Sequence, residues 1–271
     1  MIAPARSYFI CTTPRSGSTL LSEALTRTEL AGRPREYFQE LPSTLRLATP
    51  HDYVGFVPDP VVREVLSSRG ANRRSEDADL QAGYPSWRDY LTSAIAEGTT
   101  DGGIFAAKVM WRYFGGLLLR LRATQGAGND LELIERAFGP PQFVFLRRAD
   151  KVGQAVSLWR AIQTWSCRAE TDGESSAVAL EYSFAAIDHL VRRLELDEAD
   201  WGRWFRAVGV EPHAVEYSQV AGDYARATRG VLDFLGVPTP IALDEPPPLR
   251  RQADEISESW ADRYRTELAA S

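Results

Sequence analysis

Cysteine and histidine are scarce in this chain, and their scarcity excludes several kinds of site. The 271 residues include 2 cysteines, Cys11 and Cys167, too few for a disulfide framework or a cysteine zinc site. The 3 histidines lack the close spacing of metal ligands (His51, His189, His213). We therefore expect no metal site and the reducing environment of the cytoplasm.

Long apolar segments and an excess of positive charge are also missing. No stretch approaches membrane-spanning length, and the first residues lack the basic start and apolar core of a signal peptide. The net charge is −6, which argues against broad nucleic-acid binding. We expect no membrane insertion and no nucleic-acid partner. Any anionic ligand must then be held by a local cluster of arginines and backbone N–H groups.

What the chain does contain is the alternation of apolar strands and amphipathic helices that is typical of an α/β protein. With no internal repeat or clear domain boundary, we expect one domain over residues 1–271, built on a mostly parallel sheet flanked by helices. Residues 67–83 are polar and predict an exposed, mobile insertion, and 41–60 predict a loop. The predicted strands are 7–11, 104–110, 141–146 and 213–217. The predicted helices are 20–25, 61–66, 87–97, 111–122, 131–138, 150–161, 178–196, 201–208, 224–235 and 257–268, and they include extra helical segments beyond those that flank the sheet.

The turn after the first strand is the most informative motif. It reads Thr-Thr-Pro-Arg-Ser-Gly-Ser-Thr over residues 12–19 and leads directly into a helix. Backbone N–H groups at such a turn converge on one point, and the helix dipole adds positive charge there. The motif therefore predicts a P-loop-like anion cradle, to which Arg15 adds a cationic donor. Ser18 occupies the place of the lysine of nucleoside triphosphatases. The alternative is an ordinary Gly/Ser turn.

Three further features predict chemistry. Glu36 lies between an arginine and two aromatic residues, where a carboxylate can serve as a general base, or can be a surface charge on a short helix. Lys108 interrupts an apolar strand and either extends to solvent or faces an anionic site. Arg147 and Arg148 end the strand 141–146, and the carboxyl ends of parallel strands bind ligands. The first strand ends at the cradle in the same way, so these two strand ends could hold two phosphate groups of one nucleotide.

Taken together, the motifs resemble those of sulfotransferases that use 3′-phosphoadenosine-5′-phosphosulfate (PAPS), and among them the bacterial trehalose 2-sulfotransferases most closely. The resemblance extends from about residue 8 to about residue 265. It is carried by four ordered blocks, which are Pro14–Leu21 (PRSGSTLL), Glu36–Gln39 (EYFQ), Gln154–Ala161 (QAVSLWRA) and Arg251–Asp254 (RQAD).

The resemblance implies a site for PAPS and for its product PAP. Residues 13–19 would bind the 5′-phosphosulfate, Arg148 and Ser157 the 3′-phosphate, and Tyr217 the adenine side, while a C-terminal segment, 246–271, would cover the nucleotide. Arg147 remains an alternative to Arg148. The implied nucleotide ligands are Thr13, Pro14, Arg15, Ser16, Gly17, Ser18, Thr19, Arg148, Ser157, Tyr217, Arg251 and Gln252.

The resemblance also implies the reaction. Glu36 would act as the base, Arg15 would stabilise the transferring group, and no metal would be needed. The implied acceptor is a carbohydrate hydroxyl, first the 2-hydroxyl of trehalose, with another sugar, a glycolipid or a small-molecule hydroxyl as alternatives. The insertion near 69–83 would shape the acceptor side, and the family resemblance implies a homodimer. The implied acceptor-binding residues are Arg33, Glu36, Tyr37, Phe38, Gln39 and Lys108.

Two other functions are compatible with an anion cradle. A P-loop kinase or nucleotidase would need the absent loop lysine and a strand-terminal aspartate for magnesium. A nucleotide-binding protein without catalysis would not need both Glu36 and Arg15, which are present.

Overall fold

A computed structural model describes residues 4–49, 51–68, 83–164, 180–238 and 255–271. Its centre is a parallel four-stranded sheet with the strand order β2-β1-β3-β4. The predicted parallel α/β architecture is thereby confirmed, and each strand overlaps a predicted one. The strands are β1 (Arg6–Thr12), β2 (Ile104–Met110), β3 (Pro141–Arg147) and β4 (His213–Glu216).

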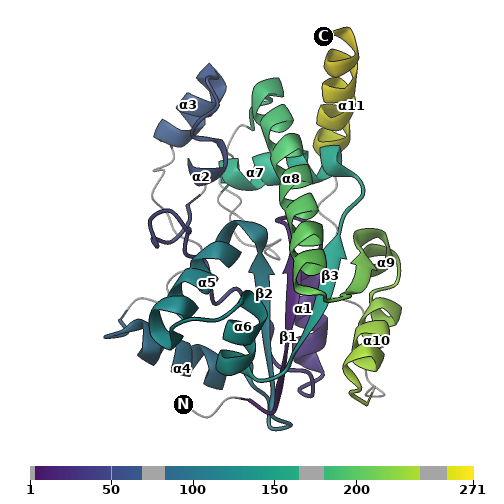
Figure 1. Ribbon diagram of the computed structural model, residues 1–271. Helices are drawn as coiled ribbons and strands as arrows, with labels where there is room; N and C mark the ends of the chain where they lie inside the picture. The colour runs from purple at the N-terminus through teal and green to yellow at the C-terminus, as the bar shows by residue number, and fades with distance from the viewer. Residues whose placement is uncertain (1–3, 50, 69–82, 165–179, 239–254) are drawn as a thin grey trace.

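Helices cover both faces of this sheet (Figure 1). Alternate residues of a strand point to opposite faces, so each strand contributes to two cores. Phe9, Phe105 and Phe143 pack with α4 (Trp87–Gly98), α5 (Trp111–Gln125) and α6 (Asp130–Phe138) on one face. On the opposite face, Tyr8, Ile10 and Val144 pack with α1 (Ser18–Arg27) and α10 (Tyr224–Leu235), next to α9 (Tyr217–Gly222).

A third core lies beyond the carboxyl ends of the strands, toward the end of the molecule that carries the C-terminus (Figure 1). It is formed by helices α2 (His51–Val54), α3 (Pro60–Ser68), α7 (Lys151–Thr164), α8 (Phe184–Val208) and α11 (Glu255–Ala270). Helix α8 connects this core to the sheet. Ile187 and Leu190 pack in the third core, and Trp201 and Trp204 pack against the face of the sheet that carries Phe9 and Phe143. Across the described ranges, no helix is both long and apolar enough to cross a membrane.

Two local predictions were wrong. The predicted helices 178–196 and 201–208 are one helix, α8, which begins at Phe184 because the Ser183 hydroxyl caps it by accepting from the backbone N–H of Ala186 at 3.1 Å. The polar residues between the two predicted pieces continue the helix, with Arg193 and Asp197 forming an i,i+4 ion pair at 2.6 Å. The predicted loop 41–60 contains the single-turn helix α2, whose four residues are too few to show periodicity.

Trp201 connects α8 to the end of the central strand. Its side chain is fully buried, and its indole Nε1 donates a hydrogen bond to the backbone carbonyl of Thr12 at 2.9 Å. The neighbouring Trp204 donates instead to Asp130 Oδ2, also at 2.9 Å, on a carboxylate whose side chain is 21% exposed.

We predict that Trp201→Phe lowers the free energy of unfolding by about 1–3 kcal/mol more than Trp204→Phe. Both changes replace an indole by a smaller ring. The first leaves the buried Thr12 carbonyl without its donor, whereas the partly exposed Asp130 carboxylate can accept a hydrogen bond from water instead. Urea unfolding of the two variants measures the difference. Equal losses would show that the hydrogen bond to Thr12 contributes nothing beyond ring packing.

Candidate functional site

The turn between β1 and α1 has the backbone conformation that an anion cradle requires. Arg15 and Gly17 both have positive φ, 63° and 84°, so the chain turns sharply before α1. Gly17 is needed here because a Cβ would lie 2.7 Å from Cδ2 of Tyr217. The N-cap residue of α1 is Gly17, which has no side chain to cap the helix, so the first N–H groups are available to an anion.

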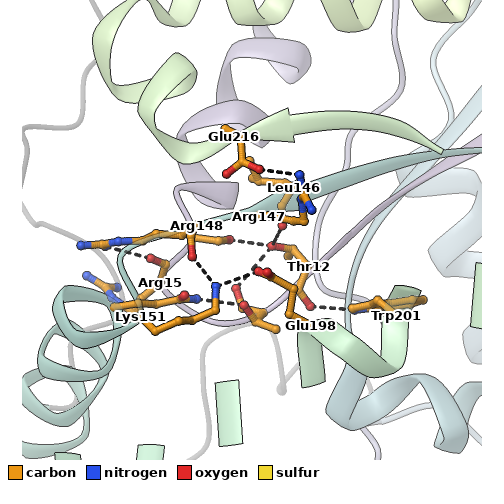
Figure 2. Close-up of polar contacts among 12 residues, drawn as sticks. Thr12, Arg15, Leu146, Arg147, Arg148, Lys151, Glu198, Trp201 and Glu216 are labelled. Atoms are coloured by element: carbon orange, nitrogen blue, oxygen red, sulfur yellow. Dashed lines mark hydrogen bonds and ion pairs between the residues drawn. The ribbon is translucent and has the colours of Figure 1, made fainter. Parts of the chain in front are cut away.

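Buried hydrogen bonds hold this turn in place, and Figure 2 shows those that join Thr12 to Leu146 and to Trp201. The Thr12 hydroxyl donates to the backbone carbonyl of Leu146 at 2.7 Å and therefore accepts from the Ser16 hydroxyl at 2.6 Å. Ser16 is fully buried, so its hydroxyl serves the turn, and only its backbone remains for a ligand. The Trp201 bond to the Thr12 carbonyl completes the support.

Gln154 is a second support that the sequence did not lead us to predict. This fully buried residue on α7 donates from Nε2 to Thr13 Oγ1 at 2.8 Å and to the Pro14 carbonyl at 2.6 Å. It holds two consecutive cradle residues in place. The signal that could have revealed it is a glutamine on the same apolar face as Ala155, Leu158 and Trp159.

The two arginines that end β3 lie in different environments (Figure 2). Arg147 forms an ion pair with Glu216 at 2.6 Å and has a side chain that is 41% exposed. Arg148 is 14% exposed and donates from Nη1 to the backbone carbonyl of Arg15 at 3.2 Å. Its guanidinium lies 4.4 Å from the ring centroid of Tyr217. The structure thus brings Arg148 and Tyr217 to the cradle and directs Arg147 toward β4.

Arg15 extends from the cradle to α7. Its Nε donates to the Ser157 hydroxyl at 3.0 Å, although the two residues are 142 positions apart in the chain. The predicted phosphosulfate residue and the predicted 3′-phosphate residue are therefore direct neighbours. Arg251 and Gln252 lie outside the described residues, as do residues 69–82 of the segment 67–83 and residues 246–254 of the segment 246–271.

Glu36 and Lys108 form an ion pair beside the cradle. Glu36 belongs to an extended segment, where Arg35 makes a parallel bridge to Ala107 and its carbonyl accepts from the Lys108 N–H at 2.9 Å. This register puts Glu36 opposite Lys108, with Oε1 and Nζ 2.9 Å apart. The Lys108 side chain does not extend to solvent, since it is 8% exposed, and its Nζ also contacts Thr19 Oγ1 at 3.4 Å.

The other residues around Glu36 stabilise its segment. Tyr37 and Phe38 are 1% and 3% exposed and face the core, so the prediction that their rings contact an acceptor is not supported by this packing. Gln39 donates from Nε2 to the Glu36 carbonyl at 3.1 Å. Arg33 donates to the carbonyls of Glu97 and Thr99 at 3.2 and 3.1 Å. These side chains fix the backbone that carries the carboxylate.

The sequence did not lead us to predict two tyrosines near Glu36. Tyr53 falls in the predicted loop 41–60, and Tyr113 occupies a position in the apolar stripe of its helix. The hydroxyls of Tyr53 and Tyr113 are 2.6 Å apart. Burial, followed by the proximity of Tyr53 and of the Glu36 charge, raises the pKa of Tyr113 well above its ordinary value. Tyr113 therefore stays protonated, and its hydroxyl can donate to that of Tyr53.

The assembled site combines an anion cradle, two arginines in contact with it and a carboxylate next to its helix. Such an arrangement can bind an anionic group and accept a proton from a hydroxyl brought up to it. Among the residues that the structure describes, no three His, Cys, Asp or Glu side chains are grouped as metal ligands.

Comparison with known proteins agrees with this chemistry. Residues 7–267 match the model of the Stf0 sulphotransferase family. The trehalose 2-sulfotransferase of Mycobacterium tuberculosis is 34% identical over 98% of this chain and 97% of its own length. The enzyme of the same name from Mycolicibacterium smegmatis is 34% identical over 96% and 94%. A solved structure, the sulfotransferase domain of the Synechococcus PCC 7002 olefin synthase, covers 98% of this chain and 89% of its own at 17% identity and a TM-score of 0.45, too weak a likeness to add support.

The family match spans nearly the whole chain, and the two curated relatives match 98% and 96% of it. The chain therefore belongs to the Stf0 sulfotransferase family.

Proposed function

We propose that this protein transfers the sulfuryl group of PAPS to a carbohydrate hydroxyl, in the first place the 2-hydroxyl of trehalose, with Glu36 as the general base. The observation that carries the proposal is the Glu36 carboxylate, paired with Lys108 beside Thr19 at the cradle helix. The two relatives with trehalose 2-sulfotransferase in their names support the choice of acceptor.

The residues of the cradle suit PAPS, which carries phosphate groups at the 5′ and 3′ positions of its ribose. The turn offers backbone N–H groups and Arg15 to one phosphate group. Arg148 suits the other, since its buried Nε has no hydrogen-bond partner among the described residues and can donate to an oxygen. Ser157 adds a hydroxyl beside Arg15.

When bound, PAPS supplies an activated sulfuryl group attached to a phosphate leaving group. Glu36 takes the proton of the acceptor hydroxyl as the hydroxyl oxygen bonds to sulfur and the bond from sulfur to the phosphate oxygen breaks. The backbone N–H groups of the turn and Arg15 stabilise the negative charge that then remains on the phosphate. Transfer of this kind depends mainly on positioning and electrostatics.

The acceptor side is formed near Tyr53 and Tyr113. The hydroxyl of Tyr53, which is half-buried, can exchange hydrogen bonds with a sugar hydroxyl, and the buried Tyr113 holds it in place at 2.6 Å. The Arg112 guanidinium lies 4.7 Å from the Tyr53 ring centroid. Another sugar, a glycolipid or a small-molecule hydroxyl could use the same groups, so the acceptor has to be tested directly.

We predict that incubation with PAPS and a panel of sugars gives a monosulfated product with trehalose. Mass spectrometry of the reactions identifies the product, and maltose is the matched control because it is also a glucose disaccharide. Sulfation of another sugar in preference to trehalose would support the proposed sulfuryl transfer but would show that trehalose is not the acceptor. ATP in place of PAPS should give no product.

We predict that Glu36→Gln lowers the turnover number by a factor of roughly 100 or more, because the proton has no acceptor. The variant should still bind PAP at least as tightly as the wild type, as measured by calorimetry. Glu97→Gln is the matched control, since Glu97 is paired with the neighbouring Arg35 and is 39% exposed. Normal turnover in Glu36→Gln would rule out Glu36 as the base.

We predict that Arg148→Ala weakens the binding of PAP by roughly 10–100-fold, because a charge-assisted hydrogen bond to phosphate contributes about 1.5–3 kcal/mol. The binding of AMP, which lacks the 3′-phosphate, should change much less. Arg147→Ala is the control and should leave both affinities nearly unchanged. If Arg147→Ala instead weakened the binding of PAP but not of AMP, Arg147 would be the residue that binds the 3′-phosphate.

A further inference from the structure

Lys108 is an unusual residue for its position. It is the one charged side chain in β2, a strand whose seven residues are all buried. An ammonium group is costly to bury unless it is paired and hydrogen-bonded. Its partners are Glu36 Oε1 at 2.9 Å and Thr19 Oγ1 at 3.4 Å. The lysine thus touches the proposed base on one side and the cradle helix on the other.

Backbone pairing fixes this arrangement before any ligand binds. Lys108 is paired with Ile10 of β1 in the sheet, and its N–H bonds to the Arg35 carbonyl on the other side. A shift of one residue in either register would turn the side chain to the opposite face. The contact with Thr19 follows because α1 covers the same face of the sheet as Ile10.

We propose that Lys108 is a positioning residue whose charge is neutralised by Glu36 in the resting enzyme and is released toward the cradle when Glu36 accepts the acceptor proton. The proposal rests on the function proposed above. Before transfer, the pair is neutral. After transfer, Glu36 is uncharged, and the ammonium is left beside Thr19 at the moment when negative charge develops on the leaving phosphate.

The two oxygens of the Glu36 carboxylate have different roles in this geometry. Oε1 contacts Lys108, and we assign Oε2 to the acceptor hydroxyl. The ammonium thus fixes one oxygen of a carboxylate whose side chain is 18% exposed and leaves the other oxygen for the acceptor.

The proposal predicts an effect on binding that does not depend on turnover. Glu36→Gln imitates the uncharged state of Glu36 after proton transfer and leaves Lys108 without its counter-charge. We therefore expect this variant to bind PAP more tightly than the wild type, by roughly 3–10-fold at low salt, with the gain shrinking as salt is added. Calorimetric titration with PAP at two ionic strengths measures both effects.

Glu97→Gln is again the matched control, because it removes one negative charge from a neighbouring pair, Arg35–Glu97, whose two side chains are each 39% exposed. It should leave PAP affinity unchanged. If Glu36→Gln bound PAP no more tightly than this control, the proposed release of charge would be wrong. This comparison uses no lysine variant and so remains decisive even if changes at Lys108 impair folding.

A double-mutant cycle tests whether Lys108 acts through Glu36. We expect Lys108→Met to lower turnover by roughly 10–100-fold in the wild type and to have little further effect in Glu36→Gln, and the double variant should lose the gain in PAP affinity. Equal losses of PAP affinity in both backgrounds would show that Lys108 binds the nucleotide directly and would overturn the proposal. An active Glu36→Gln enzyme would instead overturn the proposed base, while the affinity cycle still reports on the pair.

Discussion

Hydrogen bonds centred on Thr12 determine the shape of the cradle, and the rest of the site depends on that shape. The Thr12 hydroxyl joins Leu146 at the end of β3 to Ser16 in the turn, and its carbonyl accepts from Trp201 of α8. Three distant parts of the chain thereby meet at the carboxyl end of the central strand. Since these groups are buried, the turn is held in one conformation without a ligand, which would lower the entropy lost on binding the proposed anion.

Charge is distributed so that an acidic protein can bind an acidic ligand. The net charge is −6, yet the cations at the carboxyl edge are divided between two tasks. Arg147 and Lys151 pair closely with Glu216 and Glu198, at 2.6 and 2.8 Å. Arg148, by contrast, has Asp150 at 3.5 Å and stacks on Tyr217, so much of its hydrogen-bonding capacity remains. Distant acidic residues matter little, because their field is screened within about 10 Å.

Much of the fold was predictable because its signals are local. The strands are short apolar runs, and the cradle is a contiguous motif, so both follow from neighbouring residues. The contacts of Gln154, Tyr113 and Lys108 could not be predicted, because each depends on a partner brought near by the fold. Lys108 shows the limit clearly: the sequence left two environments open, and the decision depends on a bridge between Arg35 and Ala107 that carries no sequence signal.

The sheet fixes one part of the site, the proposed base and the cradle, whereas the proposed acceptor side can vary. The distance between the proposed base and the cradle is set by sheet pairing, since Glu36 lies beside β2 and Thr19 follows β1. The groups proposed for the acceptor side come instead from the single-turn helix α2 and the start of α5, where Tyr53 and Tyr113 meet. Substitutions there can change the shape offered to an acceptor without moving the base relative to the cradle. A fold of this kind can therefore alter its acceptor while the geometry of group transfer stays fixed.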